Sequence, residues 1–307
     1  MRLALFLLLV ACAAPSPIPA GDKPSWVSTP NGDLRFPPDR FVAGVGSVPV
    51  GQQPAPALLA SVDAAARQAV VAQLAAAVAG GFDPSPGIHV EARWRQGDTA
   101  YAWAVFDRQG ALDQQAAKVS ARQKAAADLL AQAEAAEADQ PMQALRMYVK
   151  ARLGSAAADG GLAVVRGLGG KAEAPATAGE AESRAARLAG ELTLTVVEGD
   201  RQLGVPGKPL PQAIVFTAWL KGKKAAGLPV AVSVPGGRAA AATVGEGGRG
   251  DARVDDPGKF EPVVLSADWP ALTGVPAAAV TWLPAVSVSA TVLRKSVQTT
   301  RVLVLAA

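Results

Sequence analysis

The residue types that carry most of the chemistry in proteins are scarce in this chain, which has one cysteine, Cys12, and one histidine, His89. A metal site needs several clustered His, Cys or carboxylate ligands, and these two residues cannot supply one. No Gly-x-Ser-x-Gly nucleophile motif occurs, and the paired carboxylates of Asp255 and Asp256 lie in a Gly/Pro turn, where solvation explains them. We therefore expect no catalytic residue, no metal site and no cofactor, and we predict that the protein is not an enzyme.

Cys12 lies at the end of an apolar segment near the N-terminus. Arg2 precedes an apolar run over residues 3–10, and the small residue Ala11 comes directly before Cys12. This order is typical of a secretory signal peptide. The run is far shorter than the roughly 20 residues that a membrane-spanning helix needs. We therefore expect this segment to direct export rather than to anchor the chain as a helix.

The sequence Leu9-Val10-Ala11-Cys12 resembles the lipobox of bacterial lipoproteins. The resemblance implies cleavage between Ala11 and Cys12 and acylation of Cys12, and Ala13, in place of an aspartate, implies sorting to the outer membrane. Each buried methylene of an acyl chain contributes about 0.8 kcal/mol, so two or more chains hold a protein stably on a membrane. Because Cys12 is the only cysteine, it cannot form a disulfide within the molecule. We expect a lipid-anchored protein on the periplasmic face of the outer membrane.

Charge and composition restrict the partners. The formal net charge is +4, and the cationic side chains are scattered rather than collected in a stripe, which argues against nucleic-acid binding. Residues 12–25 are rich in proline and alanine and contain few bulky apolar side chains, a composition typical of a tether. We expect two partners, the membrane through the lipid on Cys12 and a protein of the cell envelope, and no small-molecule ligand.

The segment after the tether predicts a small mixed domain. Residues 41–45 have strand character, and residues 56–79 carry apolar side chains at intervals of three and four, which predicts a helix. Residues 88–107 alternate apolar and polar side chains on both sides of Gly97-Asp98, the pattern of a tight β-hairpin.

The two-residue loop sets the register of this hairpin. The predicted cross-strand pairs are Trp94 with Tyr101, Ala92 with Trp103, and Val90 with Val105. On this register every bulky apolar side chain except Phe106 lies on one face, which we expect the helix to cover. We expect His89 to lie exposed on the polar face, across the strand from Phe106.

Three pieces of this segment occur in the order found in a known family. They are PSWV at residues 24–27, GVGS at 44–47 and YAWAVFDR at 101–108. Together they resemble the Lpp-twenty lipoprotein family, which is related to the N-terminal domain of flagellar assembly protein T. The resemblance covers residues 26–108 and implies a small α+β domain on an outer-membrane lipoprotein.

The middle of the chain predicts helices. Residues 111–139 are rich in alanine and lack glycine and proline, and residues 142–153 form a second helical pattern after Pro141. Together they suggest an antiparallel helical hairpin. A third helix is expected at residues 179–188, after a Gly/Ala/Pro stretch that we interpret as a loop or boundary.

After Glu191 the pattern changes to short strands separated by Gly/Pro-rich turns, which predicts a β-sandwich. Expected strands begin near Leu192, Ile214, Leu228 and Val286. Residues 198–237 resemble the bacterial Ig-like domains of the invasin and intimin type. The matching positions are Gln202, Gly204, Leu210 and Gly227 to Val230.

This region also contains Gly248-Arg249-Gly250-Asp251, which matches the tripeptide that integrins read. A glycine-rich turn between strands produces such a match easily. We interpret it as a plain turn and not as a sign of host adhesion.

The sequence therefore predicts an α+β chain: a small N-terminal antiparallel sheet with a covering helix, a helical hairpin, and an all-β Ig-like sandwich. The expected segments are a signal peptide (1–11), a lipidated tether (12–25), an Lpp-twenty-like domain (26–109), a helical region with a linker (110–189) and the sandwich (190–307). We expect a structural, assembly or protein-binding module of the cell envelope. The alternative is a surface-exposed adhesin-like protein that uses its Ig-like domain.

Overall fold

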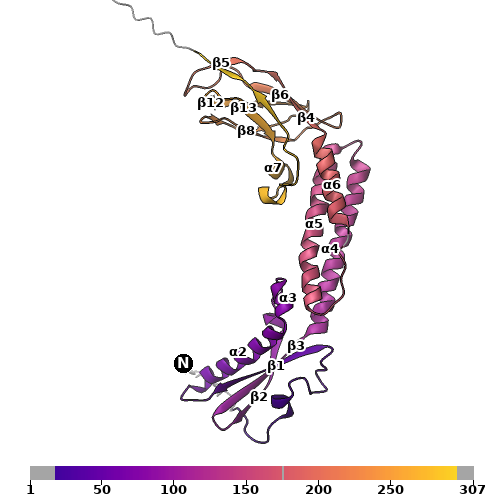
Figure 1. Ribbon diagram of the computed structural model, residues 1–307, viewed down its shortest axis with the longest axis vertical. Helices are drawn as coiled ribbons and strands as arrows, with labels where there is room; N and C mark the ends of the chain where they lie inside the picture. The colour runs from indigo at the N-terminus through magenta and orange to yellow at the C-terminus, as the bar shows by residue number, and fades with distance from the viewer. Residues whose placement is uncertain (1–17, 175, 296–307) are drawn as a thin grey trace, which may run out of the picture. The chain divides into compact units, whose positions relative to one another are not determined.

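The computed structural model describes residues 18–174 and 176–295. It mixes helices with mainly antiparallel sheets and has a strand-rich C-terminal region (Figure 1), so the mixed helix-and-sheet class expected from the sequence is confirmed. Within the described ranges, no helix combines the length and the apolarity needed to cross a bilayer.

The chain forms two compact units, and two long helices contribute to both. The helices are α4 (Arg108–Ala136) and α5 (Pro141–Gly167). The first unit contains the described residues up to 120 together with 159–174, and the second contains 121–158 and the described residues after 175.

The first unit is built on an antiparallel sheet in the order β1-β3-β2. Its strands are β1 (Phe41–Pro49), β2 (Ile88–Gln96) and β3 (Thr99–Asp107), and its shorter helices are α1 (Ser25–Ser28), α2 (Ala55–Gln73), α3 (Ala75–Ala79) and the 3-10 turn η1 (Ser85–Gly87). The predicted strand and hairpin are both present. The helix predicted over residues 56–79 is interrupted at Leu74, where α2 ends and α3 begins.

Helix α2 packs on the sheet face that carries Ala100, Ala102 and Ala104, and not on the aromatic face. The two elements approach closely, because a Cβ on Gly46 of β1 would overlap the backbone of Ala66. The prediction that this helix covers the bulky apolar face is therefore wrong. Small side chains let a helix come nearer to the sheet, and the closer packing leaves less empty volume between them.

The aromatic face of the sheet is covered by the chain that precedes β1. Trp103 is fully buried, stacks on Trp26 at a centroid distance of 6.0 Å and meets Phe36 edge-on at 5.3 Å. Its indole N–H donates to the carbonyl of Pro30 at 3.1 Å. Residues 26–36 thus take the place that the sequence analysis assigned to the helix.

The hairpin register agrees with the prediction from the turn as far as Ala92. Trp94 lies opposite Tyr101, and Ala92 lies opposite Trp103. Beyond Ala92 the pairing changes, because β2 carries a β-bulge at Glu91.

The bulge moves the start of β2 by one residue relative to β3. Val90 lies opposite Ala104, and His89 lies opposite Val105. The predicted pairs of Val90 with Val105 and of His89 with Phe106 are therefore wrong. One extra residue reverses the alternation, so His89 shares the face of Val105.

Two helices of the middle region, α5 and α6, are longer than predicted, whereas α4 has the predicted length and begins three residues earlier. Helix α5 continues to Gly167, beyond the expected end near residue 153, and α6 spans Thr177–Gly190. Two glycines of α5, Gly154 and Gly161, face α4: a Cβ on Gly161 would lie 2.5 Å from a methyl group of Val119. Packing against α4 compensates for the low helix propensity of glycine, and sequence patterns do not show such packing.

The strand-rich region of the second unit contains two four-stranded sheets, β10-β8-β13-β14 and β11-β6-β4 with β7 paired to β6. The remaining pairs are β12-β9 and the parallel pair β15-β5. Strand bounds are β4 (Leu192–Glu198), β5 (Gln202–Gly204), β6 (Ile214–Leu220), β7 (Lys223–Lys224), β8 (Pro229–Ser233), β9 (Arg238–Ala239), β10 (Ala242–Thr243), β11 (Arg249–Ala252), β12 (Val254–Asp256), β13 (Val263–Ala267), β14 (Ser287–Ala290) and β15 (Val292–Arg294), with helix α7 (Trp269–Thr273) and the 3-10 turn η2 (Ala277–Ala279) between β13 and β14.

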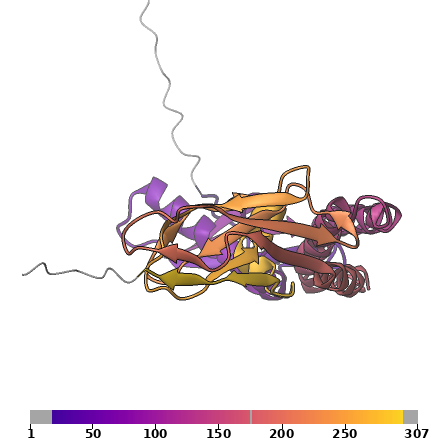
Figure 2. The same cartoon turned by 90° about the horizontal axis from the view of Figure 1, so that it is seen from above.

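The two larger sheets share one core, and Figure 2 shows their strands from above. Phe216 of β6 and Leu265 of β13 belong to the same buried cluster as Leu145 of α5 and Leu188 of α6. The strands expected near Leu192, Ile214 and Leu228 are present, and the one expected from Val286 is divided into β14 and β15.

Candidate functional site

Ala11 and Cys12, the residues expected at the cleavage and lipidation site, lie outside the described residues. From residue 18 onward the chain is attached to the sheet. The backbone N–H of Arg95 donates to the carbonyl of Pro19 at 3.1 Å, and Ala20 forms a parallel bridge with Arg95. Ile18 packs against the core between α2 and the sheet.

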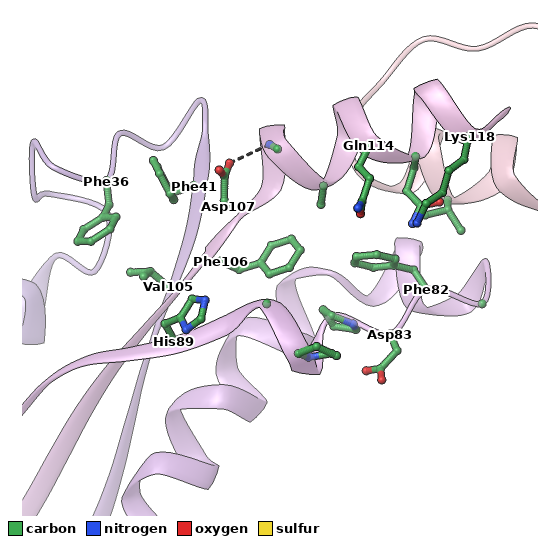
Figure 3. Close-up of a pocket in the computed structure, with 18 of the residues that line it drawn as sticks. Phe36, Phe41, Phe82, Asp83, His89, Val105, Phe106, Asp107, Gln114 and Lys118 are labelled. Atoms are coloured by element: carbon green, nitrogen blue, oxygen red, sulfur yellow. Dashed lines mark hydrogen bonds between the residues drawn. The ribbon is translucent and has the colours of Figure 1, made fainter. Parts of the chain in front are cut away.

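A cleft of about 760 Å³ opens in the first unit, where β2 begins and β3 ends (Figure 3). Aromatic rings line it from end to end. Phe82 and Phe106 meet at a centroid distance of 6.0 Å with their planes at 67°. Phe36 and Phe41 meet edge-on at 5.2 Å and lie at the other end in Figure 3.

Polar side chains stand on two opposite sides of these rings. Figure 3 shows Gln114 and Lys118 of α4 on one side of Phe106 and Phe82, and His89 and Asp83 on the other. Glu91 of β2 also lines the cleft. The cleft therefore offers a cation from α4, carboxylates from β2 and from the loop before η1, and an apolar surface beside them.

Some of these polar groups are already engaged. Asp107 receives the backbone N–H of Gly110 at 2.8 Å, which caps the start of α4, and forms an ion pair with Arg40 at 3.0 Å. The Arg40 guanidinium holds the pKa of Asp107 below its ordinary value. Glu91 and Lys118 also line the cleft, and Glu91 lies near enough to Arg35 for the two charges to attract each other. Both side chains are exposed and can reach a bound molecule.

His89 lies exposed on β2, as the sequence analysis expected, although its neighbours differ from those predicted. The bulge at Glu91 brings it into the cleft wall beside Val105. The cleft is not among the sites predicted from the sequence. The available signal was Phe82, an aromatic residue between Gly81 and Pro84 in a stretch otherwise suited to a turn.

A second polar cluster lies inside the second unit, around Glu137. The Tyr148 hydroxyl donates to Glu137 Oε2 at 2.7 Å, and Arg187 donates to Oε1 at 2.7 Å. Lys221 Nζ donates to the same Oε1. Only 11% of the Glu137 side chain is exposed, so the carboxylate is surrounded by donors from α5, α6 and the turn after β6.

The donors around Glu137 determine its charge. Burial alone would raise the pKa of Glu137, but the hydrogen bonds from Arg187, Lys221 and Tyr148 outweigh this effect and lower the pKa from 4.5 to about 2. Burial and the contact with Glu137 raise the pKa of Tyr148 to about 12. A carboxylate that stays ionised and fully bonded joins elements together, and this one links α5, α6 and the turn after β6.

The Arg249-Gly250-Asp251 tripeptide lies in strand β11, and not in a turn as predicted. Arg249 pairs across the ladder with Thr217 and forms an ion pair with Glu198 at 2.7 Å. Gly250 lies against the ring of Phe216, where a Cβ would overlap that ring. The tripeptide is therefore part of a sheet.

Among the residues that the structure describes, no group of three or more His, Cys, Asp or Glu side chains is placed to hold a metal ion. A scan against protein-family models found no match, and searches of curated proteins and of solved structures found no significant match.

Proposed function

We propose that this protein is a non-enzymatic bacterial lipoprotein, anchored to the outer membrane by acylated Cys12, that binds a protein of the cell envelope. One observation carries the proposal: the single cysteine follows a short apolar run, and the folded chain is attached to its sheet only six residues later. A cysteine at this position is suited to carry a lipid that anchors the chain to the membrane. The Lpp-twenty-like first domain and an Ig-like fold of the C-terminal strands belong to the same proposal.

The cleft supports the binding part of the proposal. It combines Phe82 and Phe106 with an exposed cation, Lys118, and an exposed carboxylate, Glu91. An extended segment of a partner protein that presents an apolar side chain between an acidic and a basic one would match this arrangement.

The anchor is tested by comparing the wild-type protein with Cys12→Ser in the same bacterial host. The wild type should incorporate labelled palmitate and fractionate with outer membranes. The variant should do neither. A serine variant that still fractionates with outer membranes would overturn the proposal. Protease shaving of intact cells separates the periplasmic orientation from the adhesin-like alternative, because only a surface-exposed chain would be cut.

The docking site is tested by placing a photo-crosslinking amino acid at Gln114, which lines the cleft, and in a second variant at Ala116, an exposed position on α4 that does not line the cleft. We expect a discrete crosslinked envelope protein from Gln114 and not from Ala116. The crosslink should weaken when Lys118 is changed to Glu. Equal crosslinking from both positions would contradict a role for the cleft.

A further inference from the structure

The two ends of the sheet in the first unit differ in their distance from Cys12. We name one the hairpin end, residues 48–51 and 95–99, where β1 ends and the β2–β3 turn lies. The cleft lies at the opposite end, where β2 begins and β3 ends. The nine residues of β2 separate the two ends by about 27 Å.

The N-terminal segment joins the sheet at the hairpin end. Arg95 donates its backbone N–H to Pro19, and Ala20 forms a parallel bridge with Arg95. Residues 18–20 are therefore already held in the first unit, although composition alone suggests a tether as far as residue 25.

This attachment shortens the reach of the anchor. Five residues, 13–17, separate Cys12 from Ile18, so a fully extended chain spans at most about 21 Å between their Cα atoms. A tether that ran freely to Trp26 would reach about twice as far.

We infer that the hairpin end is the membrane-proximal surface of the first unit and that the cleft is held on the side of this unit away from the lipid, open to a partner in the aqueous phase. The inference rests on the proposed acylation of Cys12. The reach of the tether is shorter than the distance between the two ends of the sheet. The exposed side chains at the hairpin end include both Arg95 and Asp98, so the short tether, rather than attraction to anionic headgroups, sets this orientation.

The test measures energy transfer from two positions to the lipid headgroups. The acylated Cys12 has no free thiol, so a cysteine introduced by Asp98→Cys or by Ser85→Cys can be labelled alone. Both positions are exposed, and they lie beyond opposite ends of β2. Each purified, lipidated full-length variant is labelled with a donor dye and reconstituted into phosphatidylethanolamine–phosphatidylglycerol vesicles that carry a headgroup-linked acceptor.

We expect roughly twofold or greater energy transfer from position 98 than from position 85, because about 27 Å separates the ends of β2. Inserting ten Gly/Ser residues after Pro17 should remove most of this difference. Equal transfer from both positions, or greater transfer from position 85, would overturn the orientation while leaving the anchor intact. Protein that fails to float with the vesicles would overturn the anchor itself, and the orientation with it.

Discussion

Lys221, in the turn between β6 and β7, donates to the carboxylate of Glu137, which lies just after the end of α4. Lys221 adopts a φ of 51°, a left-handed conformation that is uncommon outside glycine. The turn is completed by Gly222 at φ 72°. The contact joins the corner between α4 and α5 to the C-terminal sheet, and its partners define the first prediction.

Replacing Glu137 by Gln should destabilise the second unit by about 2–3 kcal/mol, because Arg187 and Lys221 would lose the negative charge of the carboxylate to which both donate. Urea unfolding followed by circular dichroism measures this loss. Glu180→Gln is the matched control: Glu180 forms an exposed i,i+4 ion pair with Arg184, and its loss should cost less than about 0.5 kcal/mol. Similar losses in the two variants would show that the buried cluster has no special role.

The stability of the wild type should also depend on pH through Glu137. Its pKa is depressed in the folded state, from 4.5 to about 2, so the carboxylate stabilises the fold above pH 4.5 and loses this contribution as the pH falls from 4.5 to about 2. The shift corresponds to about 3 kcal/mol. The difference in unfolding free energy between wild type and Glu137→Gln should shrink over this window. A difference that stayed constant down to pH 2 would contradict the assigned pKa.

Gly46→Ala should disrupt the first unit, because the new Cβ would overlap the backbone of α2 at Ala66. Backbone cannot move aside as a flexible side chain can, so we expect a loss of about 3 kcal/mol or more. Gly160→Ala is the control, because open space surrounds that position in α5. Alanine has a higher helix propensity than glycine, so this substitution should stabilise the protein by about 0.5–1 kcal/mol. Thermal unfolding of both variants checks the pair, and a neutral Gly46→Ala would mean that α2 lies farther from the sheet.

Asp107 should be needed for the first turn of α4, and thereby for one wall of the cleft. Asp107→Ala removes both the cap to Gly110 and the ion pair with Arg40, and it should cost about 1–2 kcal/mol. Asp107→Asn keeps the capping oxygen and should lose less. Hydrogen exchange at the amide of Gly110 distinguishes the two variants, with fast exchange expected only in the alanine variant. Equal exchange in both would show that the ion pair, rather than the cap, orders this turn.

The hairpin shows how far the sequence predicts this fold. Gly97-Asp98 fixes the register beside the turn, and the prediction holds where each strand contributes one residue per pair. It fails at Glu91, because no particular side chain marks a bulge residue. The apolar and polar residues still alternate in the sequence, but beyond the bulge each one points to the other face of the sheet. The prediction of which sheet face α2 covers fails for a different reason. It chose the face with the larger apolar side chains, but the size of those side chains does not show how closely a helix can approach the sheet.

The candidate site was less accessible to sequence reasoning. The cleft brings together side chains from β2, β3, α4 and the loop around Phe82, and its wall at His89 depends on the bulge. Glu137 offered a weak signal, since an acidic residue at the C-terminal end of a helix is opposed by the helix dipole. Its compensating partners, Arg187 and Lys221, lie far along the chain. No local pattern connects residues that meet only in the folded protein.

The pairing of Pro19 with Arg95 also has a consequence for the order in which the sheet forms. Synthesis from the N-terminus makes residues 18–20 long before Arg95, so these residues have no partner strand until β2 has been made. Contacts close in sequence form before distant ones, because long loops cost more entropy to close. The attachment of residues 18–20 is therefore expected to follow the β2–β3 hairpin, as a late step in the folding of the first unit.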